Sequence, residues 1–177
     1  MTTYEKYRAA KNYNIKAIYL DMDGTIADLY GVNGWLDAIK AEDTKPYEEA
    51  KPMFNADEMA KVIKALKEEG YLIGVVTFTA WGCTNDYGKA IRKAKKEWLK
   101  KFFPYADMVH IVNNKREKAD VVNVPRGYLL DDEDHNVWAW TNKDDIRGEA
   151  YRVGIKVNGN VVEMLEAIAN NKVEAIA

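Results

Sequence analysis

The sequence contains little that would tie it to an oxidising compartment, a membrane or a zinc site. One cysteine, Cys83, stands among 177 residues, so an internal disulfide is excluded and a reducing compartment is favoured. Only two histidines, His110 and His135, accompany that thiol, which leaves no His–Cys cluster for zinc. No apolar run approaches the roughly 20 residues that cross a bilayer, and no apolar signal-peptide core opens the chain. We therefore expect a cytoplasmic protein with no membrane partner.

The sequence also lacks an excess of charge of either sign. Its 26 basic and 28 acidic residues leave a formal net charge of −2, whereas dedicated nucleic-acid-binding proteins usually carry a basic excess. The local exception is residues 89–101, which read KAIRKAKKEWLKK. Apolar residues recur in this run at helical spacing. That spacing favours a helix whose lysines face solvent over a nucleic-acid-binding patch.

Short apolar segments alternate with amphipathic segments along the chain. Apolar runs predict strands at residues 15–20, 71–77, 108–112, 127–130 and 150–157. Helical spacing and capping residues predict helices at residues 34–41, 55–69, 86–101, 117–122 and 161–169. This alternation predicts one α/β domain over residues 1–177, a Rossmann-like three-layer αβα sandwich with a mostly parallel sheet. We expect Trp138 and Trp140 to pack inside it.

Residues 29–54 interrupt this alternation between the first strand and its crossover helix. Loops of this length in compact domains are commonly functional lids or linkers, and the apolar content of the segment disfavours a linker. We interpret it as a small cap inserted after the first strand, with a long structural loop as the alternative. Its aromatic residues either stack on a bound base or pack the cap onto the core: Tyr30, Trp35, Tyr47 and Phe54.

Reactive polar residues follow the predicted strands at their carboxyl ends. They are Asp21 and Asp23 after the first strand, Thr77 after the second, Lys115 and Lys118 after the third, and Asp131 and Asp132 after the fourth. In an open parallel sheet these ends share one edge, where ligands bind. Taken alone, the DMDG run at residues 21–24 suits a solvated turn as well as a cation site. The distant LLDD run at residues 129–132 favours a site.

The residue types at this edge indicate phosphoryl chemistry with a metal. Clustered carboxylates repel one another unless a hard cation neutralises them, and Mg²⁺ prefers carboxylate oxygens together with substrate phosphate. Asp21, Asp131 and Asp132 therefore suggest a magnesium site. One carboxylate could attack phosphorus, and a second could protonate the leaving group and then activate water. A threonine could hydrogen-bond a phosphoryl oxygen, and a lysine could hold the nucleophile and offset the developing negative charge.

The motifs YLDMDGT and LLDDEDHN, with a strand ending in threonine and a lysine between them, resemble the haloacid dehalogenase superfamily of phosphotransferases. The resemblance spans Lys16 to about Ile168. It implies that Asp21 is the nucleophile and a Mg²⁺ ligand. It also implies that Asp23 is the general acid and base, with its backbone carbonyl as a further ligand. Thr77 matches the phosphate-binding residue, and Thr79 is its rival.

The same resemblance extends to the acidic pair and the lysine. It implies that Asp131 contacts the metal directly and that Asp132 supports it, often through water. Lys118 is preferred as the phosphate-binding lysine, because Lys-x-x-Val-Val at the start of a short helix resembles the cytosolic 5′(3′)-deoxyribonucleotidase branch and its phage and bacterial relatives. Lys115 is the reserve.

The function that the resemblance implies is Mg²⁺-dependent hydrolysis of a small phosphomonoester through an aspartyl-phosphate. The substrate it suggests is a (deoxy)nucleoside monophosphate, which would make the protein a 5′-nucleotidase. Two alternatives stay open. A polynucleotide end phosphatase is motivated by residues 89–101. A non-catalytic phosphoryl-binding module is the other, although such modules usually lose one of the two leading aspartates and this sequence keeps both.

Overall fold

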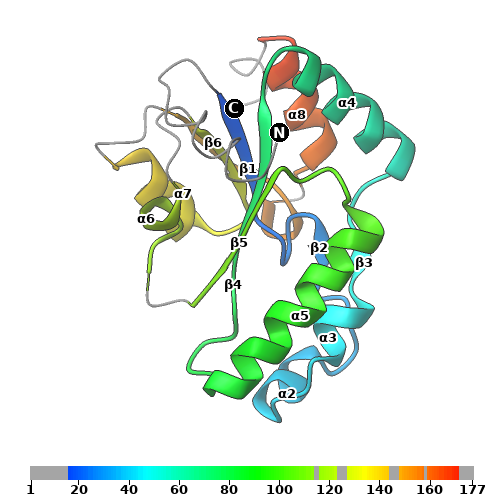
Figure 1. The fold of residues 1–177 in the computed structure, drawn as a ribbon, viewed down its shortest axis with the longest axis vertical. Coiled ribbons are helices and arrows are strands. Elements are labelled where there is room, and N and C mark those ends of the chain that lie inside the picture. The colour runs from blue at the N-terminus through cyan, green and yellow to red at the C-terminus, as the bar shows by residue number, and fades with distance from the viewer. Residues whose placement is uncertain (1–15, 114–115, 123–126, 144–147, 158, 172–177) are drawn as a thin grey trace.

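Five parallel strands form the centre of the molecule. The computed structural model describes residues 16–113, 116–122, 127–143, 148–157 and 159–171. The sheet has the order β5-β4-β1-β6-β7 (Figure 1). Its strands are β1 (Ala17–Leu20), β4 (Leu72–Phe78), β5 (Met108–Val112), β6 (Gly127–Asp131) and β7 (Ala150–Arg152). The predicted α/β fold with a parallel sheet is confirmed.

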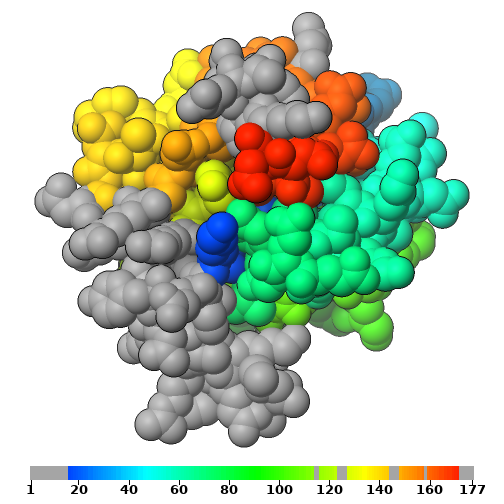
Figure 2. All heavy atoms as spheres, turned by 90° about the horizontal axis from the view of Figure 1, so that it is seen from above, coloured from blue at the N-terminus to red at the C-terminus, as the bar shows by residue number. Residues whose placement is uncertain are grey.

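Strand β1 runs through the middle of the sheet and is buried on both faces. Ile18 and Leu20 face one hydrophobic cluster, and Ala17 and Tyr19 face the other, as the two-residue period of a strand requires. Helices α4 (Ala56–Glu68), α5 (Asn85–Phe102) and α8 (Val161–Ala169) contribute to the first cluster. Helices α6 (Lys118–Val121) and α7 (Asp134–Thr141) contribute to the second. Figure 2 shows α8 beside α4 at the end where β1 begins.

A small insert follows β1, as predicted. It contains α2 (Trp35–Lys40) and α3 (Lys45–Glu49), and a short antiparallel pair of β2 (Ala27–Asp28) with β3 (Lys51–Pro52) returns the chain to the core. Leu29 and Tyr47 of the insert pack against the N-terminal half of α5, and the C-terminal half of α5 packs on the core (Figure 1). Helix α5 therefore joins the insert to the sheet.

The strand register brings the ends of β1 and β6 to nearly one level, while β4 continues past them to Phe78. Leu20 on β1 is paired with Val75 on β4 and with Leu130 on β6. The ladder continues for one more bond, because the Asp21 amide donates to the Leu130 carbonyl at 2.9 Å. The polar residues that follow these strands therefore share the carboxyl edge of the sheet.

Two local expectations need correction, and one helix was missed. The fifth strand ends at Arg152 rather than at residue 157, because Gly154 has a φ of +108° and a 3₁₀ turn, η1 (Ile155–Val157), follows. Helix α7 was not predicted. On α7, Trp140 is buried, but Trp138 is 67% exposed, so the expectation that both tryptophans pack inside is wrong for Trp138. Among the described residues, no helix is long and apolar enough to cross a bilayer.

Candidate active site

Asp21, the first residue after β1, is buried and held by a lysine. The Lys118 ammonium donates to Asp21 Oδ1 at 2.5 Å and to Asp131 Oδ2 at 2.6 Å. Helix α6 begins at Lys118 and places this side chain, itself buried, between the two carboxylates. Burial opposes the charged form of Lys118, but Asp131 and Asp21 outweigh that effect and raise its pKa above the usual value. Lys118 is therefore a fixed cation beside Asp21.

The neighbouring carboxylates Asp131 and Asp132 have opposite surroundings. Asp131 Oδ1 accepts from the Glu133 amide and from Asn136 Nδ2, both at 3.0 Å. With Lys118 on Oδ2, both Asp131 oxygens are engaged. Asp132 is also buried, yet neither of its carboxylate oxygens has a hydrogen-bond partner within the described part of the chain. A buried carboxylate without a partner is costly, so Asp132 is placed to receive a ligand.

The carboxylates at this edge fit a divalent metal. One ligand oxygen from each of Asp21, Asp131 and Asp132 lies within 4.8 Å of the others. Burial, and then the charges of Asp21 and Asp131, raise the pKa of Asp132 to about 7. Burial, opposed by Lys118 and reinforced by Asp131 and Asp23, raises the pKa of Asp21 to about 6. Oxygen-only ligands and repelling carboxylates suit Mg²⁺.

A second buried lysine stands on the other side of the site. Lys95, on α5, is 0% exposed. Its ammonium donates to Asp23 Oδ2 at 2.5 Å, and to Thr77 Oγ1 and the Phe78 carbonyl at 2.8 Å each. The expectation that the lysines of residues 89–101 face solvent is therefore wrong for Lys95. The missed signal is spacing, since Lys95 lies four residues after Ile91 and four before Leu99, on the buried face of the helix.

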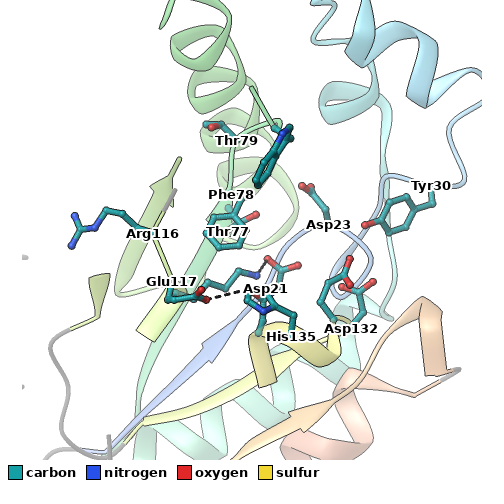
Figure 3. Close-up of a pocket in the computed structure, with 14 residues that line it drawn as sticks. Asp21, Asp23, Tyr30, Thr77, Phe78, Thr79, Arg116, Glu117, Asp132 and His135 are labelled. Carbon is teal, nitrogen blue, oxygen red and sulfur yellow. Dashed lines mark hydrogen bonds and ion pairs between the residues drawn. The ribbon is translucent and has the colours of Figure 1, made fainter. Parts of the chain in front are cut away.

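A cavity of about 470 Å³ lies between these strand ends, and it is bordered by Asp21, Asp23 and Asp132 but not by Asp131 or Lys95. Figure 3 shows Asp21, Asp23, Thr77 and Asp132 arranged around a common space. The remaining lining residues include Lys118, Tyr30, Phe78, Thr79, Trp81, Arg116 and His135. The structure thus brings Thr77 and its rival Thr79 to the same cavity, whereas Lys115 lies outside the described residues.

Of the four aromatic residues proposed to stack on a base, Tyr30 lines the cavity. Trp35 packs edge-on against the Tyr30 ring, with 5.0 Å between ring centroids, and Phe54 packs against Phe103. The Tyr47 side chain is buried. Sequence reasoning missed Trp81, which lines the cavity and is 85% exposed. Its one signal was its place in a glycine-containing loop after a strand, where binding residues concentrate.

Comparisons with known proteins give likenesses to solved structures. No protein-family model matches the sequence, and no curated protein matches it. Among solved structures, the chain is similar to 3-deoxy-D-manno-octulosonate 8-phosphate phosphatase from Moraxella catarrhalis, in complex with magnesium, phosphate and KDO. The two chains are 16% identical, the match covers 97% of this chain and 95% of the other, and the TM-score is 0.41. A likeness at this level assigns neither family nor substrate.

The charges of the buried acidic and basic side chains at the site indicate what it can bind. Four carboxylates, those of Asp21, Asp23, Asp131 and Asp132, meet the two ammonium groups of Lys95 and Lys118. When all four carboxylates are ionised, they exceed the two ammonium groups by two negative charges, which one divalent cation neutralises. With such a cation bound, a phosphoryl dianion can enter among a cation, a lysine and a threonine hydroxyl.

Proposed function

We propose that this protein hydrolyses small phosphomonoesters with Mg²⁺, through an aspartyl-phosphate on Asp21. One observation carries the proposal. The Lys118 ammonium binds one oxygen of Asp21, a buried carboxylate that borders a cavity. Beside it stands a second buried carboxylate, Asp132, whose oxygens have no hydrogen-bond partner among the described residues. The resemblance of YLDMDGT and LLDDEDHN to the haloacid dehalogenase superfamily supports the same chemistry.

Asp21 and Asp132 would hold the Mg²⁺, together with the Asp23 carbonyl that the resemblance implies. This arrangement exchanges the roles expected of the acidic pair, because Asp131 already has partners on both oxygens and fixes Lys118. When bound, Mg²⁺ supplies charge neutralisation for the phosphoryl group and the carboxylates.

In the first step, an Asp21 oxygen forms a bond to phosphorus while the bond from phosphorus to the leaving oxygen breaks. Asp23 gives its proton to that leaving oxygen. Thr77 and Lys118 donate hydrogen bonds to the phosphoryl oxygens, and Lys118 also offsets their negative charge. The alcohol then leaves through the open side of the cavity.

In the second step, Asp23 takes a proton from a water molecule as the water oxygen bonds to phosphorus. The bond between phosphorus and the Asp21 oxygen breaks, which restores the Asp21 carboxylate and releases inorganic phosphate. The same carboxyl group therefore acts as acid and then as base, and it needs a fixed orientation in both steps.

A (deoxy)nucleoside monophosphate is our proposed substrate. Tyr30, Phe78 and the exposed ring of Trp81 line the cavity around the catalytic carboxylates, and aromatic faces stack on nucleobases. The end-phosphatase alternative has less support, because Lys95, in the middle of the basic run, is buried.

Phosphate release from a panel of phosphomonoesters tests this function. With Mg²⁺, we expect the wild type to hydrolyse nucleoside monophosphates with lower KM than glycerol phosphate, and Asp21→Asn to lose turnover by about 10⁴-fold or more, since the nucleophile is removed. Asp28→Asn is the matched control, because Asp28 accepts from the Gly31 amide at 2.8 Å in a turn and an asparagine can do the same.

Three results would contradict parts of the proposal. Full activity of Asp21→Asn would exclude the aspartyl-phosphate. Substrate binding by the wild type without any turnover would favour the non-catalytic module. A strong preference for the terminal phosphate of an oligonucleotide, with steeply salt-dependent binding, would favour the end phosphatase.

A further inference from the structure

The buried ammonium of Lys95 has no role in the chemistry described above, although it contacts two residues of the site. We propose that Lys95 is a positioning residue that orients Asp23 for both proton transfers. This inference rests on the proposed function.

All three N–H donors of the Lys95 ammonium are used. A lysine ammonium has three donors and no acceptor, and here they meet Asp23 Oδ2, Thr77 Oγ1 and the Phe78 carbonyl. With three fixed acceptors and no exposed surface, the ammonium cannot rotate to another partner without losing a bond in a buried place, which is costly. Lys95 is therefore a rigid connection between α5, the end of β4 and the loop after β1.

For Asp23, this connection decides which oxygen does the chemistry. Oδ2 is held by Lys95, so Oδ1 is the oxygen that carries and releases the proton. A carboxyl group protonated on Oδ1 still has Oδ2 as an acceptor. The Lys95 bond can therefore persist through both steps and keep Asp23 aimed into the cavity as the leaving oxygen departs and the water arrives.

Thr77 accepts a hydrogen bond from the same ammonium and keeps its own donor. The hydroxyl oxygen of Thr77 accepts from Lys95 at 2.8 Å, so its own hydrogen points elsewhere and can be donated to a phosphoryl oxygen. The insert encloses this arrangement, because the Tyr47 ring lies 5.2 Å from the Lys95 ammonium. A cation in contact with an aromatic face is kept from water without losing all its stabilisation.

A purely structural role for Lys95 makes a different prediction. A buried ion pair that serves only the fold would, when removed, lower activity on every substrate alike. A lysine that orients the general acid matters most when the leaving group needs a proton. p-Nitrophenolate leaves without protonation, whereas an alkoxide does not.

The first experiment therefore compares Lys95→Met with wild type on glycerol phosphate and on p-nitrophenyl phosphate. On glycerol phosphate we expect kcat to fall by about 10²-fold, the usual contribution of general acid–base catalysis. On p-nitrophenyl phosphate we expect one rapid equivalent of nitrophenolate per enzyme at nearly the wild-type rate. Slow turnover should follow, because Asp23 must still activate water. Lys96→Met, an exposed lysine on the same helix, is the matched control.

The second experiment adds Lys95→Met to Asp23→Asn. If Lys95 acts through Asp23, the second change lowers kcat no further, whereas independent effects would multiply. The double variant also leaves no unpaired carboxylate at position 23, so this comparison still holds if Lys95→Met alone unfolds.

Two results would overturn the inference: an equal loss of the rapid phase on p-nitrophenyl phosphate and of kcat on glycerol phosphate, or a further loss in the double variant. Failure of the proposed function would look different from both results. In that case the wild type itself would release no phosphate, or would release it equally well after Asp21→Asn.

Discussion

At the scale of single residues, the most informative pair is Asp131 and Asp132. Both belong to one motif, and the sequence predicts that both reach the metal. Adjacent residues at the end of a strand point to opposite sides, however, so they meet different neighbours. Asp131 meets Lys118 and Asn136, whereas Asp132 lines the cavity and has no hydrogen-bond partner in the part of the chain that the structure describes. The sequence pattern identifies the two carboxylates, but it does not show the hydrogen bonds that give them different roles.

Gly24 gives the prediction that belongs to this scale. Its φ is +82°, and a Cβ at this position would lie 2.5 Å from Asp132 Oδ2 and 2.7 Å from Tyr30 Cε2. We expect Gly24→Ala to lose about 1–3 kcal/mol of unfolding free energy from backbone strain. It should also bind Mg²⁺ more weakly, because Asp132 must move. Chemical unfolding and calorimetric titration with Mg²⁺ measure the two effects.

Gly70→Ala separates strain from displacement. Gly70 has a similar φ of +88°, but a Cβ there has open space within 4 Å. This control should lose stability and keep its Mg²⁺ affinity. Equal Mg²⁺ affinities in the two alanine variants would show that Gly24 does not shape the metal site.

At the scale of helices and strands, periodicity predicted the elements that present a continuous apolar stripe. The helix expected at residues 86–101 is α5 (Asn85–Phe102), and the helix expected at 161–169 is α8 (Val161–Ala169). Helix α7 has no such stripe, because Trp140 is buried and Trp138 is exposed, so its pattern indicated no helix. Spacing places Lys95 on the buried face of α5, but the partners of its ammonium come from the ends of β1 and β4, which is tertiary information.

The contact between the insert and α5 gives the prediction for this scale. The Glu42 carboxylate accepts from Thr84 Oγ1 at 3.0 Å and from the Thr84 amide at 3.3 Å, where α5 begins. We expect Glu42→Ala to weaken docking of the insert by about 1 kcal/mol. KM for a nucleoside monophosphate should rise less than tenfold, with kcat on p-nitrophenyl phosphate unchanged.

Steady-state kinetics on both substrates measure this effect. Glu49→Ala is the matched control, because Glu49 forms an exposed ion pair with Lys45 inside the insert and does not bridge to α5. A loss of kcat on both substrates in Glu42→Ala would mean that the insert holds the catalytic groups and not the leaving group.

At the scale of the whole molecule, the alternation of strands and helices was enough to predict a parallel sheet whose carboxyl edge gathers distant residues. Asp21 and Lys118 are 97 residues apart in the chain and share a hydrogen bond. What the alternation could not predict is the depth of burial at that edge. Asp21, Asp131, Asp132 and both lysines are buried, so the electrostatics of the site are coupled to the stability of the entire fold.

That coupling predicts a metal-dependent pH profile of stability. The pKa of Asp132 is raised from 3.8 to about 7 and that of Asp21 to about 6. Between about pH 4 and these values the folded state keeps protons that the unfolded state has lost. The unfolding free energy of the metal-free protein therefore falls as pH rises through this window, by up to about 1.4 kcal/mol per pH unit for each group. Above about pH 7 this contribution is gone.

Because Mg²⁺ binds the ionised carboxylates, its stabilising effect should grow over the same window. Thermal unfolding in EDTA and in Mg²⁺, at about pH 5 and about pH 8, measures both trends. Of the two carboxyl groups, Asp132 has the higher pKa. The metal-free Asp132→Asn variant should therefore lose less unfolding free energy between about pH 6 and about pH 7 than the metal-free wild type. A Mg²⁺-induced shift in Tm that is equal at both pH values would contradict a metal held by these carboxylates, since protons and metal would then not compete for the same oxygens.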